Sequence, residues 1–406
     1  MDMIKKIAIV HTDFRLYWHS RLQALSSYLK EKQVELHIVE ISGKGSPYNF
    51  DKMQKNSQML WRQLFEEDEM ESIDPKLARK AVVRALDDIR PDIVLSGAIA
   101  FPSGAASILW AWQNKRPLVV FDNARLEDVQ RPWHVNFIKK KLYSMVDAMV
   151  IPAPSHIETF TYFGLSEKQL FFGINCIDNA FFDQCNNDAS IEKDHILVDK
   201  RYILAIGRQV KKKNWTELLK AFMDIAEMQE MTDWHLVFIG NGPDHQKLID
   251  IAGTQRDRRI HFRDYKTQME LCTYYGRAEA LILPSLYGET WGLVVNEAMA
   301  SGLPVIVSKK CGCSKTLVLE GKNGYLLDPD SRADMKNVLL RFAALPEAKR
   351  IEMGRASKDI IAEWGLERFC NGVWDACEFV HNKGKKNGSP AGKLLSLFWN
   401  GRYRPT

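Results

Sequence analysis

The chain has 406 residues, of which 46% are hydrophobic and 26% are charged, and its formal net charge is +5 at pH 7. Such a composition is that of a folded globular protein, and the length predicts two or three domains because a single hydrophobic core rarely grows so large. The sequence contains no known RNA- or DNA-binding motif and no basic stripe with interleaved aromatic residues, so we expect no nucleic-acid partner.

In the first half of the chain, short apolar runs alternate with amphipathic helical patterns, which predicts parallel strands joined by crossover helices. The expected strands are residues 6–10, 34–41, 93–96, 118–121 and 148–151, and the expected helices are 21–30, 76–89 and 135–144. The first apolar run is too short for a signal peptide. Residues 93–114 carry no charge and are long enough for a transmembrane helix, but interruptions by glycine and proline predict a strand, a loop and a helix instead.

The same pattern restarts after residue 200. The expected strands are residues 202–206, 235–239, 260–262, 280–283 and 305–307, and the expected helices are 215–228, 244–252, 268–275 and 292–301. The predicted fold class is therefore α/β, with two Rossmann-like, doubly wound parallel sheets. Because ligands of such sheets bind at the carboxyl ends of the strands, we expect the active site in a cleft between the two domains.

The domain boundary is expected in a polar stretch, rich in Asn and Asp, that ends near residue 200. We place it after residue 178, so that residues 179–365 form the C-terminal domain. Beyond it, residues 383–404 combine basic side chains with an apolar cluster, a pattern that suits an anionic membrane surface. Packing of this tail against the first domain and disorder are the alternatives.

Seven cysteines are scattered along the chain without a C-x2-C pair, so a zinc site has little support and a reducing cytoplasm is expected. We interpret Cys311-Gly312-Cys313 as a turn of small residues near the ligand, with a metal or redox site as the alternative. Asp328-Pro-Asp330 matches a D-x-D metal motif, but it lies between a predicted strand and helix, which favours a turn and a helix cap.

The most informative segment is residues 289–297, where Glu289 and Glu297 flank the start of a helix that is otherwise nearly free of charge. A carboxylate on an apolar helix costs free energy unless a donor pairs with it. Sugar hydroxyls are suitable donors, and a nearby Lys or Arg is the alternative.

Cations and glycines follow the neighbouring strands. Gly207 lets the chain turn, and Arg208 and Lys213 are then expected to stabilise a departing diphosphate. A solvated run of lysines is the alternative. Gly240 lies in a Gly-Asn-Gly-Pro turn that is expected to line the nucleotide pocket and that is a poor NAD motif. The free backbone N–H groups at Gly292 and Leu293, where a helix begins, also suit a diphosphate.

These motifs, Gly-Arg-x4-Lys, Gly-x-Gly-Pro, Pro-Ser-x3-Glu-x7-Glu-Ala and Gly-x-Pro-Val, resemble in order and spacing the retaining glycosyltransferases of the two-domain GT-B fold, family 4, glycosyl transferases group 1. The resemblance is good over residues 200–330. It implies that Glu289 contacts the donor sugar, that Glu297 holds the ribose, and that Arg208 and Lys213 hold the diphosphate without a metal. It also implies that the final helix crosses back, so that residues 366–406 would join domain 1–178.

The resemblance implies a retaining, metal-independent hexosyl- or N-acetylhexosaminyl-transferase with a nucleotide-sugar as co-substrate and no other cofactor. The acceptor would be a saccharide or lipid-linked saccharide of cell-surface polysaccharide or glycolipid synthesis, used in the cytoplasm or by a peripheral membrane protein at the inner face of the plasma membrane. A glycoside phosphorylase or synthase of the same fold and a non-catalytic nucleotide-sugar-binding subunit are the alternatives.

The first half departs from the family pattern. Many members have a glycine-rich loop after the first strand, whereas this chain has aromatic residues with Arg15 and His19, which are candidates for acceptor binding. Solvated charges at a helix start are the alternative. Where many members have a His after the strand 118–121, this chain has Asp122, a candidate for the reacting centre. Arg131 and His134 are further acceptor candidates.

Overall fold

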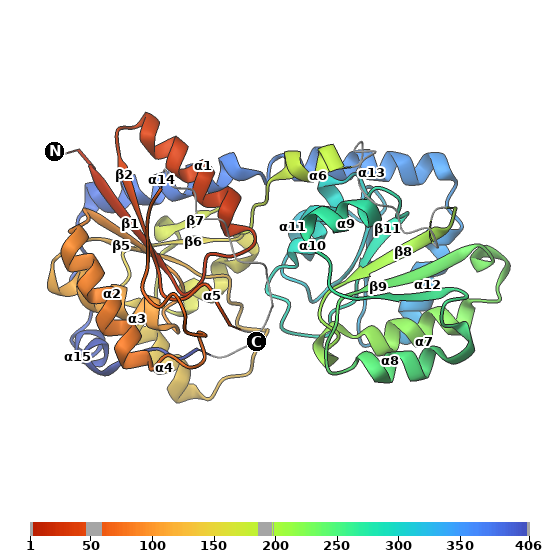
Figure 1. Ribbon diagram of the computed structural model, residues 1–406, viewed down its shortest axis with the longest axis horizontal. Coiled ribbons are helices and arrows are strands. Elements are labelled where there is room, and N and C mark those ends of the chain that lie inside the picture. Colours follow the sequence, from red (N-terminus) through yellow and green to blue (C-terminus); the bar gives the residue numbers. More distant parts are fainter. Residues whose placement is uncertain (1–2, 46–58, 186–196, 198, 404–406) are drawn as a thin grey trace. The chain divides into compact units, whose positions relative to one another are not determined.

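The computed structural model describes residues 3–45, 59–185, 197 and 199–403. The chain forms two compact units (Figure 1). Unit 1 comprises residues 1–126, 130–176 and 366–406, and unit 2 comprises residues 127–129 and 177–365. The chain thus leaves unit 1 two residues before the boundary expected from the sequence and returns to it at residue 366, where a return was expected.

Unit 1 is built on a seven-stranded sheet with the order β3-β2-β1-β4-β5-β6-β7, in which every pairing is parallel. Its strands are β1 (Lys6–His11), β2 (Glu35–Glu40), β3 (Leu60–Gln63), β4 (Ile93–Ser96), β5 (Leu118–Phe121), β6 (Ala148–Ile151) and β7 (Leu170–Phe172). The two edge strands, β3 and β7, are not among the strands predicted from the sequence.

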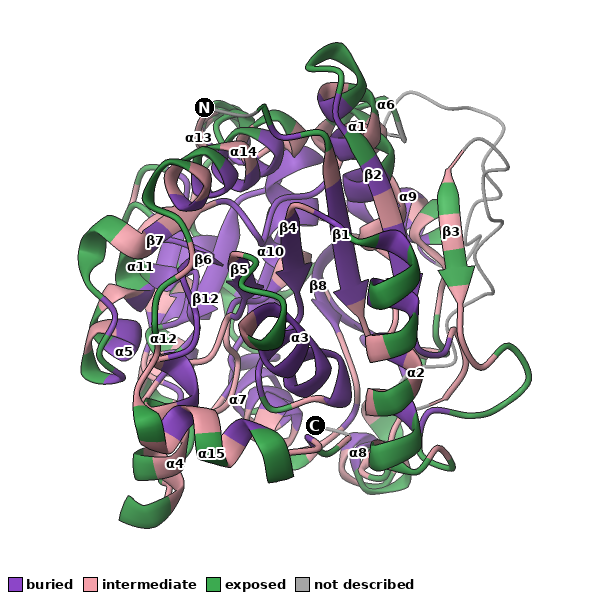
Figure 2. Cartoon of the chain, turned by 90° about the vertical axis from the view of Figure 1, so that its left-hand side faces the viewer, coloured by how far each residue is buried: buried purple, intermediate pink, exposed green. Residues whose placement is uncertain are grey.

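Helices cover both faces of this sheet, and side chains alternate between two cores accordingly. On β1, Ala8 and Val10 face one core and Ile7 and Ile9 face the other. The first core is covered by α2 (Pro75–Ile89), α3 (Pro102–Gln113), α4 (Trp133–Tyr143) and α5 (Ile157–Tyr162), and the second by α1 (Trp18–Glu31) and α14 (Leu366–Lys383). Strands buried on both faces read as continuous apolar runs, which is why they stand out in the sequence; they lie at the centre of Figure 2.

The uncharged stretch 93–114 forms β4, a loop and α3, as expected. Within the part of the chain that the structure describes, no helix combines the length and the apolar character needed to cross a bilayer.

Unit 2 is built on a six-stranded parallel sheet with the order β10-β9-β8-β11-β12-β13. Its strands are β8 (Arg201–Ile206), β9 (Trp234–Ile239), β10 (Ile260–Arg263), β11 (Ala280–Leu283), β12 (Val305–Ser308) and β13 (Gly324–Leu327). Its longer helices are α6 (Asn179–Cys185), α7 (Trp215–Ile225), α8 (His245–Ala252), α9 (Gln268–Tyr275), α10 (Leu293–Ala300), α12 (Arg332–Ala343) and α13 (Glu347–Ala362), and α11 (Ser314–Leu317) is a single turn. The predicted fold class, two doubly wound α/β sheets, is confirmed.

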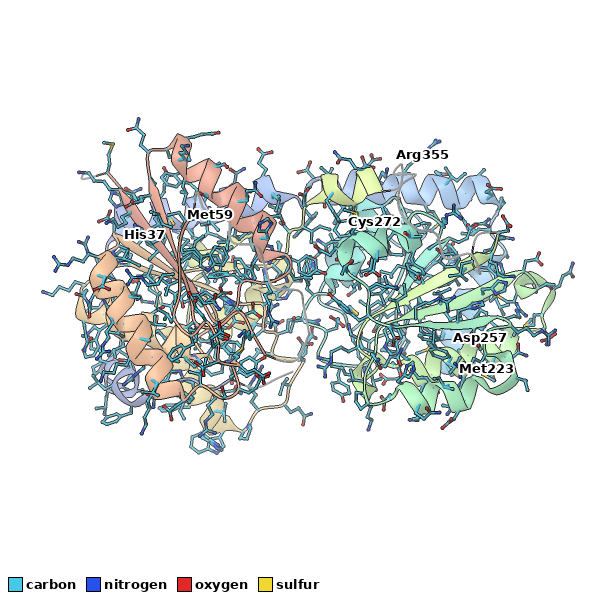
Figure 3. The ribbon with its side chains drawn as sticks, in the orientation of Figure 1. His37, Met59, Met223, Asp257, Cys272 and Arg355 are labelled. Atoms are coloured by element: carbon cyan, nitrogen blue, oxygen red, sulfur yellow. The ribbon has the colours of Figure 1, made fainter. Side chains whose placement is uncertain are left out.

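Strand order reverses direction between β1 and β4 in unit 1 and between β8 and β11 in unit 2. Loops at the carboxyl ends of strands flanking such a switch point separate and leave room for a ligand. In unit 2 the loops after β8 and β11 carry most of the predicted donor-binding residues, while Gly240 follows β9 and Leu293 and Glu297 lie on α10. Side chains of both units are drawn in Figure 3, where His37 marks β2 and Met223 marks α7.

The described part of the tail after α14, up to residue 403, packs against unit 1, which was one of the alternatives. Residues 390–398 form α15 (Pro390–Phe398), which packs against α3 and α4 of unit 1. Lys385 leads into it and forms an ion pair of 2.7 Å with Asp147.

Candidate functional site

The loops after β8 and β9 pack against each other at the carboxyl edge of the unit 2 sheet. Gly207 and Gly240 both have positive φ, +145° and +126°. Any side chain at Gly240 would overlap the carbonyl oxygen of Gly207. Gln209, which no predicted motif specifies, joins the two loops: its Nε2 donates to the Gly240 carbonyl at 2.7 Å, and its Oε1 lies 2.7 Å from His245 Nδ1. A single glutamine in a loop carries no motif, so only the structure reveals this role.

Lys213 and Glu289 form an ion pair, although 76 positions separate them in the chain. Lys213 ends the short 3-10 turn Lys211–Lys213 after β8, and Glu289 lies in the loop between β11 and α10. Their side chains are only 11% and 16% exposed, and Ser285 Oγ donates to Glu289 Oε2 at 3.0 Å. The structure therefore brings together two of the residues predicted for the donor site.

The pKa of Glu289 shows what this pairing does. Burial pushes that pKa upward, but the Lys213 ammonium, the hydrogen bonds from Lys213 and Ser285, and the charge of Lys212 outweigh burial and hold it below its usual value. Burial also lowers the pKa of Lys212, and the neighbouring charges of Lys213 and Arg208 lower it further while Glu289 opposes them. Arg208, Lys212 and Lys213 thus share one electrostatic neighbourhood with the carboxylates of Glu289 and Asp128, and positive charge is still in surplus. Such a surplus suits an anionic ligand.

Glu297 lies on α10 and is 1% exposed. Its Oε2 accepts a hydrogen bond of 2.6 Å from the hydroxyl of Tyr275, a fully buried residue of α9. One partner of Glu297 is therefore a tyrosine, whereas Glu289 has the lysine partner that the alternative expected for one of the two carboxylates. The contact of Glu297 with a ribose stays a prediction, as does its convergence with Glu289 on one ligand.

Helix α10 begins as predicted directly after Gly292, whose φ is +103°, with Leu293 as its first residue. Neither residue caps the helix with a side chain. The first N–H groups of a helix have no intrahelical partner, and the helix dipole adds partial positive charge there. The helix start follows Glu289 by four positions, which places both in the same loop-to-helix junction.

The turn Cys311-Gly312-Cys313 is hydrogen-bonded to the backbone of this loop-to-helix junction. The Gly312 N–H donates to the Glu289 carbonyl at 2.9 Å, and the Cys313 N–H donates to the Trp291 carbonyl at 3.2 Å. A Cβ on Gly312 would overlap the Thr290 carbonyl oxygen, so only glycine allows this contact. Both cysteines are buried and in the thiol form. The turn therefore holds the backbone that carries Glu289.

The Asp328-Pro-Asp330 segment is a turn, as interpreted. The Asp330 N–H donates to Asp328 Oδ1 at 3.0 Å, and Asp330 Oδ2 pairs with Lys310 Nζ at 2.5 Å. The helix cap, however, is Ser331, whose hydroxyl accepts from the Asp334 N–H, so the expectation of an aspartate cap was wrong by one position. A serine oxygen reaches the third N–H of a helix as readily as an aspartate does.

In unit 1, Asp122 closes the turn after β5. Its Oδ2 accepts a 2.6 Å hydrogen bond from the Tyr143 hydroxyl and its Oδ1 accepts one of 2.9 Å from the Ala124 N–H. Burial, followed by the charge of Asp122, raises the pKa of Tyr143 well above its usual value. These contacts fix the aspartate in the fold, and its part in a reacting centre stays a prediction.

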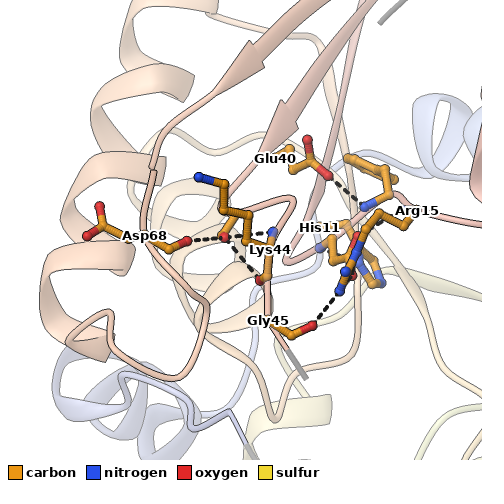
Figure 4. Close-up of polar contacts among 9 residues, drawn as sticks. His11, Arg15, Glu40, Lys44, Gly45 and Asp68 are labelled. Atoms are coloured by element: carbon orange, nitrogen blue, oxygen red, sulfur yellow. Dashed lines mark hydrogen bonds and ion pairs between the residues drawn. The ribbon is translucent and has the colours of Figure 1, made fainter. Parts of the chain in front are cut away.

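The four acceptor candidates lie on different elements of unit 1. Arg15 is 8% exposed, pairs with Asp13 at 2.7 Å and donates to the Gly45 carbonyl at 2.8 Å (Figure 4). It is thus an internal brace of the loop after β1 and not a solvated charge. His19 is partly exposed in the first turn of α1, while Arg131 precedes α4 and His134 is exposed at its start. Binding of an acceptor by these residues stays a prediction.

Comparison with known proteins identifies the domain that holds the Lys213–Glu289 pair. Residues 186–359 match the family model of glycosyl transferases group 1. The chain carries a glycosyl transferases group 1 domain. This domain coincides with most of unit 2.

Several curated proteins are similar to part of this chain. Mannosylfructose-phosphate synthase of Agrobacterium fabrum is 24% identical over 212 residues, which cover 49% of this chain and 46% of that protein. A D-inositol 3-phosphate glycosyltransferase of Arthrobacter sp. is 31% identical over 174 residues, which cover 42% of this chain and 40% of that protein. The chain thus spans about half the length of the curated relatives it matches.

Solved structures extend the likeness to both units. Sucrose-phosphate synthase from Thermosynechococcus elongatus has a TM-score of 0.69 at 17% identity and covers 94% of this chain and 100% of its own. Anabaena Alr3699/HepE in complex with UDP and glucose has a TM-score of 0.69 at 12% identity and covers 93% of this chain and 100% of its own. At such identities the likeness shows the fold alone, and that fold is GT-B.

Proposed function

We propose that this protein is a glycosyltransferase that moves a sugar from a nucleotide-sugar donor to a saccharide or lipid-linked acceptor. The observation that carries the proposal is the buried Lys213–Glu289 pair beside Arg208 and Lys212, at the carboxyl end of β8 and the start of α10, inside a group 1 domain. In this proposal the reaction is retaining and metal-independent, the sugar is a hexose or N-acetylhexosamine, and the product belongs to cell-surface polysaccharide or glycolipid synthesis on the cytoplasmic side of the membrane.

In the proposed reaction, each charged side chain of the site has a separate role. Arg208 and Lys213 stabilise the negative charge that develops on the diphosphate as the bond to the sugar breaks, with the helix start at Gly292 and Leu293 contributing N–H groups. Glu289 contacts the sugar hydroxyls and, through its ion pair, orients the Lys213 ammonium. Glu297 holds the ribose, and the Tyr275 hydroxyl orients that carboxylate.

A panel of nucleotide sugars on the full-length protein tests this proposal. A donor present at 100 times its Kd stabilises the folded state by about 2.7 kcal/mol, which raises the melting temperature measurably. The donor found in this way should be turned over slowly to free sugar and nucleoside diphosphate without an acceptor. A donor that binds and is never cleaved, with or without acceptors, supports the non-catalytic subunit instead.

A sugar phosphate as second substrate is the alternative that a specific observation favours. Two similar proteins, mannosylfructose-phosphate synthase and sucrose-phosphate synthase, are named for phosphorylated products. Cleavage of the donor accelerated by a sugar phosphate, and not by unphosphorylated saccharides, would select this synthase function. Acceleration by inorganic phosphate would select a phosphorylase.

A further inference from the structure

Helix α15 packs only Leu395 of its large apolar residues against the unit 1 core, and its buried positions are otherwise small. Gly392 and Ser396 are buried. Leu394, Leu397 and Phe398 are 60%, 40% and 74% exposed. A surface helix normally buries its large apolar face, so this arrangement indicates that the outer face has a partner.

The inward face must be small because α15 lies directly on the backbone of α4. A Cβ on Gly392 would lie 2.5 Å from the Lys141 carbonyl oxygen. The hydroxyls of Ser144 and Ser389 lie 2.8 Å apart. The helix therefore packs by close backbone approach and leaves Leu394, Leu397 and Phe398 outside.

Other contacts fix the rotation of α15, so that the exposed side chains are not free to turn inward. Arg79 Nη1 donates to the carbonyls of Leu397 and Trp399 at 3.0 Å each. Trp399 Nε1 donates to the Ile99 carbonyl at 2.8 Å. These bonds come from α2 and from the loop before α3, and they hold the C-terminal end of α15 in one orientation.

The neighbouring α4 exposes apolar side chains in the same way. Trp133 and Phe137, four positions apart on one helix face, are 79% and 51% exposed. Figure 2 shows α4 and α15 side by side at the lower edge of unit 1, with exposed residues on both. We call the exposed side of these two helices the α4–α15 face.

The two chain segments that form the α4–α15 face are rich in positive charge, although one of their cations, Lys385, is paired with Asp147. Residues 129–146 contain four Lys or Arg residues, residues 379–406 contain six, and neither segment contains Asp or Glu. The two segments therefore carry +10, while the whole chain carries +5, so the remainder carries −5. Lys140 is exposed and Lys393 partly exposed, each on the helix that carries the apolar side chains, and Arg402 is exposed just beyond α15.

We propose that the α4–α15 face binds the surface of an anionic lipid bilayer. Its aromatic and leucine side chains would enter the boundary between headgroups and acyl chains, while its lysines would remain at the phosphates. A second copy of this chain fits less well, because pairing two such faces would bring like charges together. This inference does not depend on the proposed function, although a protein held at a membrane suits a lipid-linked acceptor.

Vesicle co-sedimentation of the full-length protein tests the inference. We expect binding to vesicles of phosphatidylcholine with about 30% phosphatidylglycerol, little binding to phosphatidylcholine alone, and loss of binding as salt rises. The double variant K140E/K393E should lower the partition coefficient by at least ~10-fold, because each cation near the surface contributes about 1 kcal/mol. The matched control is K247E, which reverses an exposed lysine on α8 of unit 2.

A second pair of variants tests the apolar contribution. Phe398→Ser should weaken binding to anionic vesicles several-fold, whereas Ile351→Ser, at a 49% exposed position of α13, should not. Both substitutions lie on exposed side chains, and thermal unfolding checks that each variant folds. Equal binding to neutral and anionic vesicles, or no binding to either, would overturn the inference. So would a dimer, seen by sedimentation velocity, that Phe398→Ser dissociates, because the α4–α15 face would then be an interface between copies of this chain.

Discussion

Replacing Lys213 with alanine is the sharpest single perturbation of the candidate site. The partners in the Lys213–Glu289 pair are 11% and 16% exposed. Removing one partner of a buried pair costs roughly 3–5 kcal/mol of unfolding free energy, because the other charge remains buried. Ser285 and Lys212 continue to stabilise the Glu289 carboxylate, so we expect a cost near the lower end, about 3 kcal/mol.

The same substitution removes a cation assigned to the departing diphosphate. Loss of a stabiliser of this kind lowers kcat by about 100-fold or more, which corresponds to ~2.7 kcal/mol of transition-state stabilisation. Release of nucleoside diphosphate, measured below the melting temperature of the variant, separates this loss from unfolding. Lys211→Ala, two positions away in the same turn and exposed, is the control and should keep normal turnover and stability. A folded Lys213→Ala protein whose turnover stays within about twofold of normal would refute the assignment.

Three further predictions concern the surroundings of the site and the fold. Gly312→Ala should lower the free energy of unfolding by about 1–3 kcal/mol and reduce turnover, because the added methyl group overlaps the Thr290 carbonyl beside Glu289; unchanged urea unfolding would contradict it. Tyr275→Phe should lower the free energy of unfolding by about 1–3 kcal/mol, because it removes a hydrogen bond to the buried Glu297 carboxylate. It should also raise the KM for the nucleotide-sugar if that carboxylate holds the ribose. Denaturant unfolding and steady-state kinetics with the nucleotide-sugar measure the two effects separately. Burial lowers the pKa of His235 from 6.5 to about 4, so the folded state favours the neutral imidazole, and stability should fall as pH drops from 6.5 toward 4. Because His235 is about half buried, we expect a loss of only ~1 kcal/mol relative to His235→Gln, and parallel pH profiles of the two proteins would count against this effect.

The sequence predicted the fold well wherever strands are buried on both faces. Residues 118–121 and 148–151 are strands with the predicted bounds, because they are short runs of apolar residues with turns on either side. The edge strand β3 was missed because it is four residues long with alternating half-exposed positions, and β7 because it has only three residues. Edge strands lack the continuous burial that makes an apolar run visible.

The site was predictable where spacing along the chain carries the chemistry. Motif spacing selected Lys213 and Glu289, and the structure pairs them. The Tyr275–Glu297 bond was not predictable, because Tyr275 belongs to another helix and no motif includes it. The acceptor contact expected of Arg15 stays a prediction, and its ion pair with Asp13 was not foreseen, because composition does not distinguish such a local contact from a ligand site.

Calorimetric titration with UDP, GDP and ADP tests the central claim most directly, because it asks whether the Lys213–Glu289 region of the group 1 domain holds a nucleoside diphosphate. One of the three should bind the full-length protein without added metal, Lys213→Ala should weaken that binding by about 100-fold, in line with the loss of a buried charge-assisted contact, and Lys211→Ala should leave it unchanged. Absence of binding by all three, or equal affinity for the Lys213→Ala and unmodified proteins, would contradict the account.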